Sequence, residues 1–146
     1  MSAKTILVIG TFDTKDAELT YLADRLRDNG GRVLTMDVSV LGYPAEPTDY
    51  SKYDVAAEGG ASIEAAIGAQ DENAAMQIMA HGAALLAARL YRAGHFGGVI
   101  LLGGSMGTDL ALDVTTALPL GVPKYIISTV AFSPLIQPQR IAPDTQ

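Results

Sequence analysis

The sequence contains no cysteine among its 146 residues. This absence excludes disulfide bonds, zinc sites built from thiolates and any chemistry that needs a thiol, and it is typical of proteins kept in a reducing compartment. No apolar run approaches the roughly 18 residues that a membrane-spanning helix requires. The first apolar run, Ile6–Ile9, is too short for a signal peptide. We therefore expect a cytoplasmic protein with no membrane partner.

Positive charge is also scarce. Ten basic residues stand against 16 acidic ones, which gives a formal net charge of −6, and the basic residues form no run. A protein that holds nucleic acid through its phosphate backbone needs a basic surface, so we expect no nucleic-acid partner. An anionic small ligand would have to be held locally, by backbone amides, hydroxyl groups and a metal ion.

Common signatures of nucleotide-binding and hydrolytic sites are missing as well. Gly10–Lys15 (GTFDTK) matches neither the dinucleotide fingerprint G-x-G-x-x-G nor the P-loop, which needs a second glycine directly before Lys-Ser/Thr. Ser105 lies in the sequence Gly-Gly-Ser-Met-Gly, but the triad partners that a nucleophile elbow requires do not follow it. The two histidines, His81 and His95, lack the spacing of metal ligands. A serine hydrolase is therefore not expected, and both histidines are interpreted as structural or surface residues.

What the sequence does contain is a strand, a glycine-rich turn and a helix start in direct succession. Val99–Leu102 is a continuous apolar run, which is typical of a strand buried on both faces of a parallel sheet. It leads into Gly103–Thr108 (GGSMGT), and a helical pattern follows. Glycines allow the backbone to approach an anion closely, and the first amides of a helix point at it. We expect a phosphate group to bind here, although a tight turn that binds nothing has the same pattern.

Strand and helix patterns alternate along the whole chain. Strands are predicted at Thr5–Ile9, Arg32–Val38, Val99–Leu102 and Lys124–Ser128, and helices are predicted after Lys15 to about Asn29, around Ser62–Ile67, over Asp71–Ala93 and from about Ser105 to Leu118. The segment from Ser39 to about Gly60 is punctuated by proline and glycine and predicts a long irregular loop. The alternation indicates an α/β fold, with a parallel sheet, helices on both faces and the strand order 2-1-3-4.

In a parallel sheet of this order, ligands bind at the carboxyl ends of the strands beside the switch point, which lies between the first and third strands. The two loops there are Gly10–Lys15 and Gly103–Thr108. In the first loop, threonine hydroxyls, a lysine ammonium and helix-start amides suit a phosphate, and Asp13 suits a magnesium ion or a ribose hydroxyl. The serine and threonine of the second loop suit a phosphate or a helix cap. The alternative for Asp13 and Thr14 is that they only cap the following helix.

Further polar residues lie beside the same crevice. Asp37 ends the second strand, where nucleotide-binding α/β folds often place a carboxylate for ribose hydroxyls and where a solvated acid is equally common. Ser128 and Thr129 end the fourth strand. Asp109 lies just inside the helix after the second loop, and we interpret it as a residue that complements the helix dipole.

Four motifs resemble, in order, the Tm-1-like ATP-binding proteins, a family named after a plant virus-resistance protein: VIGTFDTK, MDVS, GVILLGGSMGT and ALPLGVPKYIISTVA. The resemblance covers nearly the whole chain. It implies a three-layer Rossmann-like subdomain over residues 1–131, an irregular tail over 132–146 that leads to a second subdomain, binding of ATP with magnesium, and self-association. Carried over position by position, it implies ligand contacts from Gly10, Thr11, Asp13, Thr14, Lys15, Gly103, Gly104, Ser105, Gly107 and Thr108, with Asp37, Ser128 and Thr129 as further candidates. No catalytic activity follows from it.

Two other functions stay open beside nucleotide binding, which we favour. The alanine-rich helix Asp71–Ala93, with Gly82 inside it, and the uncovered fourth strand suit a homodimer face, in which case the glycine loops are structural. An enzyme acting on a phosphorylated or acyl metabolite would use Asp13 or Asp37 as its base. The sequence offers no acid–base pair at a diagnostic spacing for such an enzyme.

Overall fold

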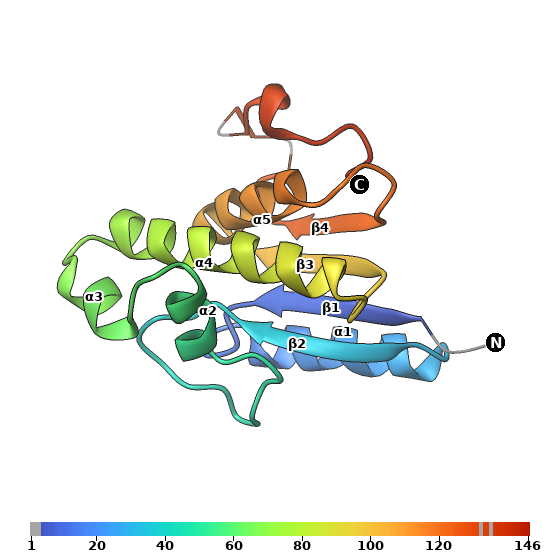
Figure 1. Ribbon diagram of the computed structural model, residues 1–146, viewed down its shortest axis with the longest axis horizontal. Helices are drawn as coiled ribbons and strands as arrows, with labels where there is room; N and C mark the ends of the chain where they lie inside the picture. Colours follow the sequence, from blue (N-terminus) through green and yellow to red (C-terminus); the bar gives the residue numbers. More distant parts are fainter. Residues whose placement is uncertain (1–3, 132, 135) are drawn as a thin grey trace.

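The computed structural model describes residues 4–131, 133–134 and 136–146. Within them lies a four-stranded parallel sheet in the order β2-β1-β3-β4, with helices on both faces (Figure 1). The strands are β1 (Thr5–Gly10), β2 (Arg32–Asp37), β3 (Gly98–Gly103) and β4 (Lys124–Ser128), and the helices are α1 (Asp16–Asp28), α2 (Lys52–Glu58), α3 (Ile63–Gly68), α4 (Glu72–Arg92), α5 (Ser105–Ala117) and the 3-10 helix η1 (Pro138–Arg140). The α/β fold and the strand order that the sequence predicts are confirmed.

The register of the sheet brings the two predicted loops to one edge. β1 pairs with β2 so that Gly10 lies opposite Asp37, and β3 pairs with β4 so that Gly103 lies opposite Ser128. β1 and β3 are themselves neighbours. All four strands therefore end at the same edge, and the switch point lies between β1 and β3, where α/β folds bind ligands.

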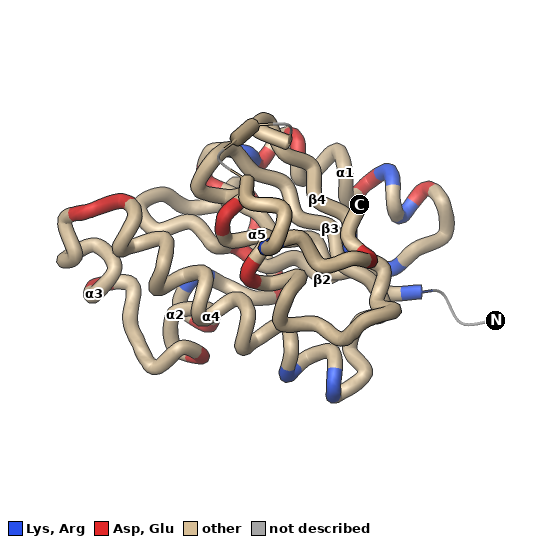
Figure 2. Tube along the Cα trace, turned by 90° about the horizontal axis from the view of Figure 1, so that it is seen from above, with Lys and Arg blue, Asp and Glu red and all other residues tan. Residues whose placement is uncertain are grey.

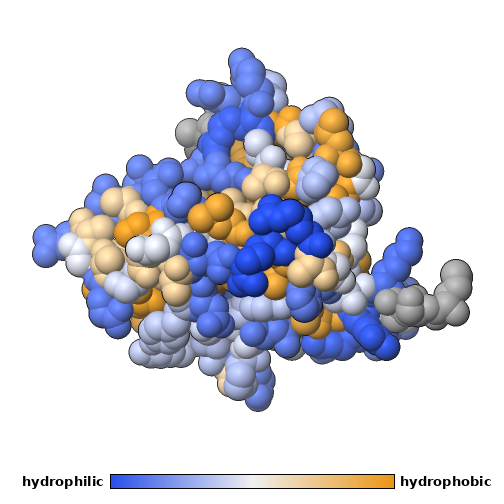
Figure 3. Space-filling view, in the orientation of Figure 1, coloured by the Kyte–Doolittle hydropathy of each residue, from blue (hydrophilic) through white to orange (hydrophobic). Residues whose placement is uncertain are grey.

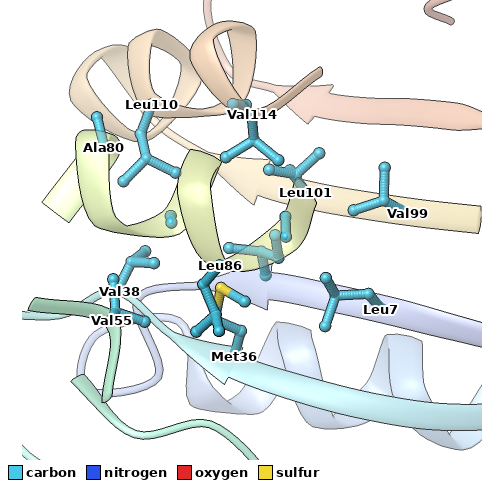
Figure 4. Close-up of a cluster of buried hydrophobic side chains, with 14 of the residues drawn as sticks. Leu7, Met36, Val38, Val55, Ala80, Leu86, Val99, Leu101, Leu110 and Val114 are labelled. Carbon is cyan, nitrogen blue, oxygen red and sulfur yellow. The ribbon is translucent and has the colours of Figure 1, made fainter. Parts of the chain in front are cut away.

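The main hydrophobic core lies between the sheet and helices α2 to α5 (Figure 4). The strands contribute Leu7, Met36 and Val99, and the two long helices of this layer contribute Leu86 and Leu110. Each of these side chains is at most 2% exposed. Complete burial of one such side chain stabilises a fold by about 1.5–3 kcal/mol. This layer therefore fixes α4 and α5 against the sheet, next to the edge where the loops meet.

Helix α1 packs on the opposite face of the sheet. Val8, Phe12 and Leu19 form a smaller core between α1 and that face. The same face of β4 is open to solvent, because the side chains of Tyr125 and Ile127 are 49% and 39% exposed. Among the described residues, the expectation of an uncovered fourth strand is therefore confirmed.

The predicted loop from Ser39 to about Gly60 is wrong in its last part, because residues 52–58 form helix α2. Ser51 and Asp54 make a capping box: the Ser51 hydroxyl accepts a hydrogen bond from the Asp54 amide, and the Asp54 carboxylate accepts one from the Ser51 amide. Val55 is fully buried on the inner face of the helix. The spacing of serine and aspartate is the sequence signal that marks this helix start.

Gly82, inside α4, packs against helix α2 and not against the sheet. A Cβ atom at Gly82 would stand 2.0 Å from the carbonyl oxygen of Val55. At the end of α2, a Cβ atom at Gly59 would stand 3.2 Å from the backbone of Gly82. The two glycines let the backbones of α2 and α4 approach each other closely. The glycine that suggested a homodimer face therefore serves a contact within the chain.

The tail after β4 is partly ordered along the edge of the sheet. Thr145 forms a parallel bridge with Lys124, and the Gln146 amide donates to the Lys124 carbonyl oxygen (3.0 Å). The buried Lys124 ammonium pairs with Asp144 at 2.7 Å and holds the pKa of that carboxyl below its usual value. Phe132, where the sequence predicts the tail to begin, lies outside the described residues.

Charged residues of both signs are distributed along the fold (Figure 2). Helix α1 carries two exposed ion pairs, between Arg25 and Asp28 and between Arg27 and Asp24. Such exposed pairs contribute about 0–1 kcal/mol each. In the ranges that the structure describes, no helix combines the length and the apolar character needed to cross a membrane.

Candidate functional site

A cavity of about 510 Å³ opens at the carboxyl edge of the sheet, where β1 and β2 end. Four parts of the chain form it: the loop after β1, the loop after β2, the end of α3 with the start of α4, and the first turn of α5. The residues that line it are Thr11, Asp13, Thr14, Ser39, Val40, Leu41, Ala66, Ile67, Gln70, Asp71, Glu72, Ala75, Met76 and Met106. The two predicted loops are therefore brought to the same cavity, the first by three of its residues and the second by Met106.

Asp13 connects the first loop to the loop after β2. Its Oδ2 atom accepts a hydrogen bond from the Gly42 amide at 3.1 Å. A Cβ atom at Gly42 would stand 2.6 Å from the Asp13 Cβ, so the two loops touch closely. The Thr11 and Thr14 hydroxyls are 3.0 Å apart. Neither Asp13 nor Thr14 is the cap of α1, because the cap position is Lys15, and the Lys15 side chain accepts no hydrogen bond from the helix amides.

The α-helices that follow the two loops differ from the other α-helices at their first residues. Helices α2, α3 and α4 are each capped by a side chain, from Ser51, Ser62 and Asp71. Helix α1, and helix α5 with Gly104 at its cap position, have no side-chain cap. Helix α1 has two acidic residues in its first turn, whereas α5 has none. Among the described residues, the start of α5 is therefore the better place for an anion, since the first turn of this helix carries no acidic side chain of its own.

The second loop is held in place by contacts that leave Gly104 and Ser105 at the surface. A Cβ atom at Gly103 would stand 2.7 Å from the Gly107 backbone, so Gly103 is required by the turn itself. Thr108 is buried, and its hydroxyl lies 2.6 Å from that of Ser128. The conformation of the second loop is therefore stabilised by three of the predicted residues, Gly103, Thr108 and Ser128.

Thr129, the predicted site residue that follows β4, lies close to the turn at Gly103 and Gly104. Its amide donates to the Gly103 carbonyl oxygen at 3.3 Å, and its hydroxyl would lie 3.8 Å from a Cβ atom at Gly104. Gly10, in the first loop, packs against α1, because a Cβ atom there would stand 2.6 Å from a methyl carbon of Leu19. Both residues border the crevice without lining the cavity.

Asp37 is buried, with 1% of its surface exposed. Its Oδ1 atom accepts hydrogen bonds from the Phe12 amide (3.2 Å), the Ser39 amide (3.0 Å) and the Ser39 hydroxyl (2.6 Å). The carboxylate thus ties the loop after β1 to the loop after β2. Asp37 does not line the cavity, but it positions the two loops that do.

Replacing Asp37 by asparagine is expected to lower the free energy of unfolding by about 1–2 kcal/mol. The amide keeps an acceptor oxygen, but hydrogen bonds to a neutral group are weaker than those to a charged one. Urea unfolding measures this loss, with Asp28→Asn as the matched control because Asp28 forms only an exposed ion pair. An Asp37→Asn variant as stable as the parent would contradict this role.

Lys52 is a buried residue of this region whose role could not be predicted from the sequence. It is 3% exposed, and its Nζ atom donates to the carbonyl oxygens of Val40 (3.0 Å) and Gly42 (2.8 Å). The ammonium also lies 4.1 Å from the centre of the Tyr43 ring, within the range of a cation–π interaction. Lys52 therefore holds the wall of the cavity that the loop after β2 provides. No spacing in the sequence indicates this contact.

Asp109 pairs with Arg140 of η1, which also pairs with Asp113 at 2.9 Å. The hydrogen bond to Asp109 raises the pKa of Arg140. A second cavity, of about 530 Å³, lies between α4 and α5 beside this cluster and includes His81. No residue of the two glycine loops lines it. His81 and His95 are both exposed, as predicted.

Comparison with known proteins places this fold in a family. The N-terminal domain of the uncharacterised protein family UPF0261 matches residues 4–141. A UPF0261 protein of Brucella suis is 52% identical over 95% of this chain and 33% of its own length. UPF0261 proteins of Clostridium tetani and Mesorhizobium japonicum are 38% and 35% identical, each over 88% of this chain. The chain spans about a third of the length of these relatives. It belongs to the UPF0261 family and corresponds to its N-terminal domain.

Proposed function

We propose that this domain binds ATP together with magnesium at the carboxyl edge of its sheet. The observation that carries the proposal is the start of α5, where a helix without a side-chain cap follows a glycine pair and borders the cavity. Free helix-start amides and the absence of an acidic first turn favour a phosphate at this position. The motifs that resemble the Tm-1-like ATP-binding proteins support the same ligand.

Within this proposal, the phosphates bind at the second loop. Gly104 and Ser105 lie at the cap and first position of α5 and are accessible to solvent. The Ser105 hydroxyl and the first amides of the helix donate hydrogen bonds to the phosphate oxygens. Helix α1 is the poorer place, because Asp16 and Glu18 in its first turn repel an anion.

A magnesium ion fits the charges around the cavity. Of the described lining residues, three are acidic and none is Lys, Arg or His. In the parts of the chain that the structure describes, no three His, Cys, Asp or Glu residues are grouped to hold a metal by themselves. Magnesium usually binds through one or two carboxylates and the phosphates of its nucleotide. Asp13 is the residue that would supply the carboxylate, since it lines the cavity from the first loop.

The affinity for ATP is expected to fall about tenfold or more when magnesium is removed, because the metal ion then no longer offsets the negative charge of the triphosphate beside the acidic cavity. Calorimetric titration with ATP in magnesium buffer and in EDTA measures the difference. Adenosine serves as the control ligand, since it carries no phosphate and should bind equally in both buffers. Equal affinity for ATP in the two buffers would contradict the role of the metal.

The second candidate function is self-association, which the open face of β4 favours. Tyr125 and Ile127 are exposed beside the half-buried Ile100 and Leu102 of β3, so an apolar strip faces solvent. Replacing Tyr125 and Ile127 by lysine is expected to convert a homo-oligomer of this chain into a monomer. Light scattering over a range of concentrations measures the mass, with Tyr21→Lys as the control on α1. A parent chain that is monomeric throughout would exclude this function.

A further inference from the structure

The cavity beside the glycine loops has an apolar wall that phosphate binding does not explain. Val40, Leu41, Ile67, Met76 and Met106 line it, from the loop after β2, from α3, from α4 and from α5. Leu41 is 76% exposed and Ile67 is 50% exposed. Apolar surface is visible over α3 and the start of α4, at the left of Figure 3. A flat apolar group that entered the cavity would remove these side chains from water.

The charges of the cavity oppose a phosphate inside it. Asp13, Asp71 and Glu72 line it, and the described lining contains no basic residue. Asp71 and Glu72 lie where α3 meets α4, an acidic end of the molecule in Figure 2. A triphosphate placed among these carboxylates would be repelled, whereas sugar hydroxyls would find acceptors.

Hydrogen bonds hold the wall of the cavity that the loop after β2 provides. Lys52 holds the carbonyl groups of Val40 and Gly42, and Asp13 holds the Gly42 amide. Gln70, at the turn between α3 and α4, has a φ of 54°. A non-glycine residue in this left-handed conformation is uncommon, and strain of this kind gathers at ligand sites. The volume of about 510 Å³ falls in the range of small-molecule sites.

We propose that this cavity takes the nucleoside half of the nucleotide. The base lies against Leu41, Ile67 and Met106, the sugar hydroxyls donate to the carboxylates at the start of α4, and the phosphates leave the cavity toward the start of α5. The inference rests on the proposed function for its phosphate end. According to this inference, the cavity recognises an uncharged, planar group that carries hydroxyls, even when no phosphate is attached. Adenosine should therefore bind without phosphates.

The test uses this chain and three probes: adenosine, ATP with magnesium, and inorganic tripolyphosphate with magnesium. The double variant Leu41→Ser and Ile67→Ser removes two side chains of the apolar wall without adding charge. Because both side chains are largely exposed, the fold should persist. Leu120→Ser is the matched control, because Leu120 is 72% exposed and does not line the cavity. Calorimetry gives the affinities, and circular dichroism verifies the fold of each variant.

We expect the parent to bind adenosine, and the double variant to bind adenosine and ATP about tenfold more weakly, with tripolyphosphate unaffected. If ATP and tripolyphosphate bind the parent but adenosine does not, the nucleoside inference fails and the proposed function stands. If adenosine binds and phosphates add nothing to the affinity, the inference stands and the phosphate site at α5 fails. Binding of no probe overturns both.

Discussion

Replacing Gly82 by alanine is expected to destabilise the domain by about 3 kcal/mol or more, at the upper end of what overpacking costs. The added Cβ atom would stand 2.0 Å from the Val55 carbonyl oxygen and 2.9 Å from its carbon, both of which are backbone atoms. A side chain can rotate away from such a contact, but here α2 as a whole must move. Val55 and its neighbours would then lose their burial in the main core (Figure 4). Urea unfolding followed by circular dichroism measures the loss.

Gly68→Ala is the matched control for this prediction. Gly68 is also helical, in α3, but a Cβ atom there would meet nothing within 4 Å. Alanine is the better helix former by about 1 kcal/mol, so this variant should be at least as stable as the parent. If the Gly82→Ala variant were as stable as the Gly68→Ala variant, the backbones of α2 and α4 would not be in close contact at Gly82.

Replacing Gly104 by valine is expected to lower the affinity for ATP about 100-fold, which corresponds to about 2.7 kcal/mol. The backbone at Gly104, with φ −79° and ψ −151°, is extended and does not have the positive φ that favours glycine. A Cβ atom would make only an ordinary contact with the Thr129 hydroxyl, at 3.8 Å. The fold should therefore persist, while the branched side chain covers the helix-start amides that the phosphates need. Calorimetric titration with ATP and magnesium measures the affinity.

Gly97→Val controls for the general effect of a valine in place of a glycine. A Cβ atom at Gly97 meets nothing within 4 Å, and Gly97 lies at the opposite end of β3 from the loop. This variant should bind ATP as the parent does. Unchanged ATP affinity in a folded Gly104→Val variant would show that the phosphates bind elsewhere.

The fold could be predicted from the sequence because its strands are short apolar runs bounded by turn residues. The predicted bounds of β4, Lys124–Ser128, agree with the structure. Helix α2 was missed because it is only seven residues long and is stabilised by its packing on α4. The capping box at Ser51 and Asp54 was a local signal for it, but proline and glycine around that segment pointed to a loop.

Only the part of the candidate site that the strand order determines could be predicted from the sequence. The strand order places the loops Gly10–Lys15 and Gly103–Thr108 at one edge, whatever their side chains do. The apolar wall of the cavity was not predictable. Leu41 lies in the loop after β2 and Ile67 lies in α3, and no sequence pattern shows that these two segments line the same cavity. The same holds for Lys52, whose partners are backbone carbonyl groups without a sequence pattern.

The proposed function depends on whether this edge of the sheet binds a nucleotide by its phosphates. Titration of the chain with ATP, ADP, AMP and NAD in magnesium buffer, by calorimetry and thermal unfolding, tests it most directly. We expect ATP to bind and the affinity to decrease as phosphates are removed. A ligand at 100 times its dissociation constant adds about 2.7 kcal/mol to the free energy of unfolding, which is easily measured. If none of the four nucleotides binds or stabilises the chain, this edge of the sheet is not a nucleotide site.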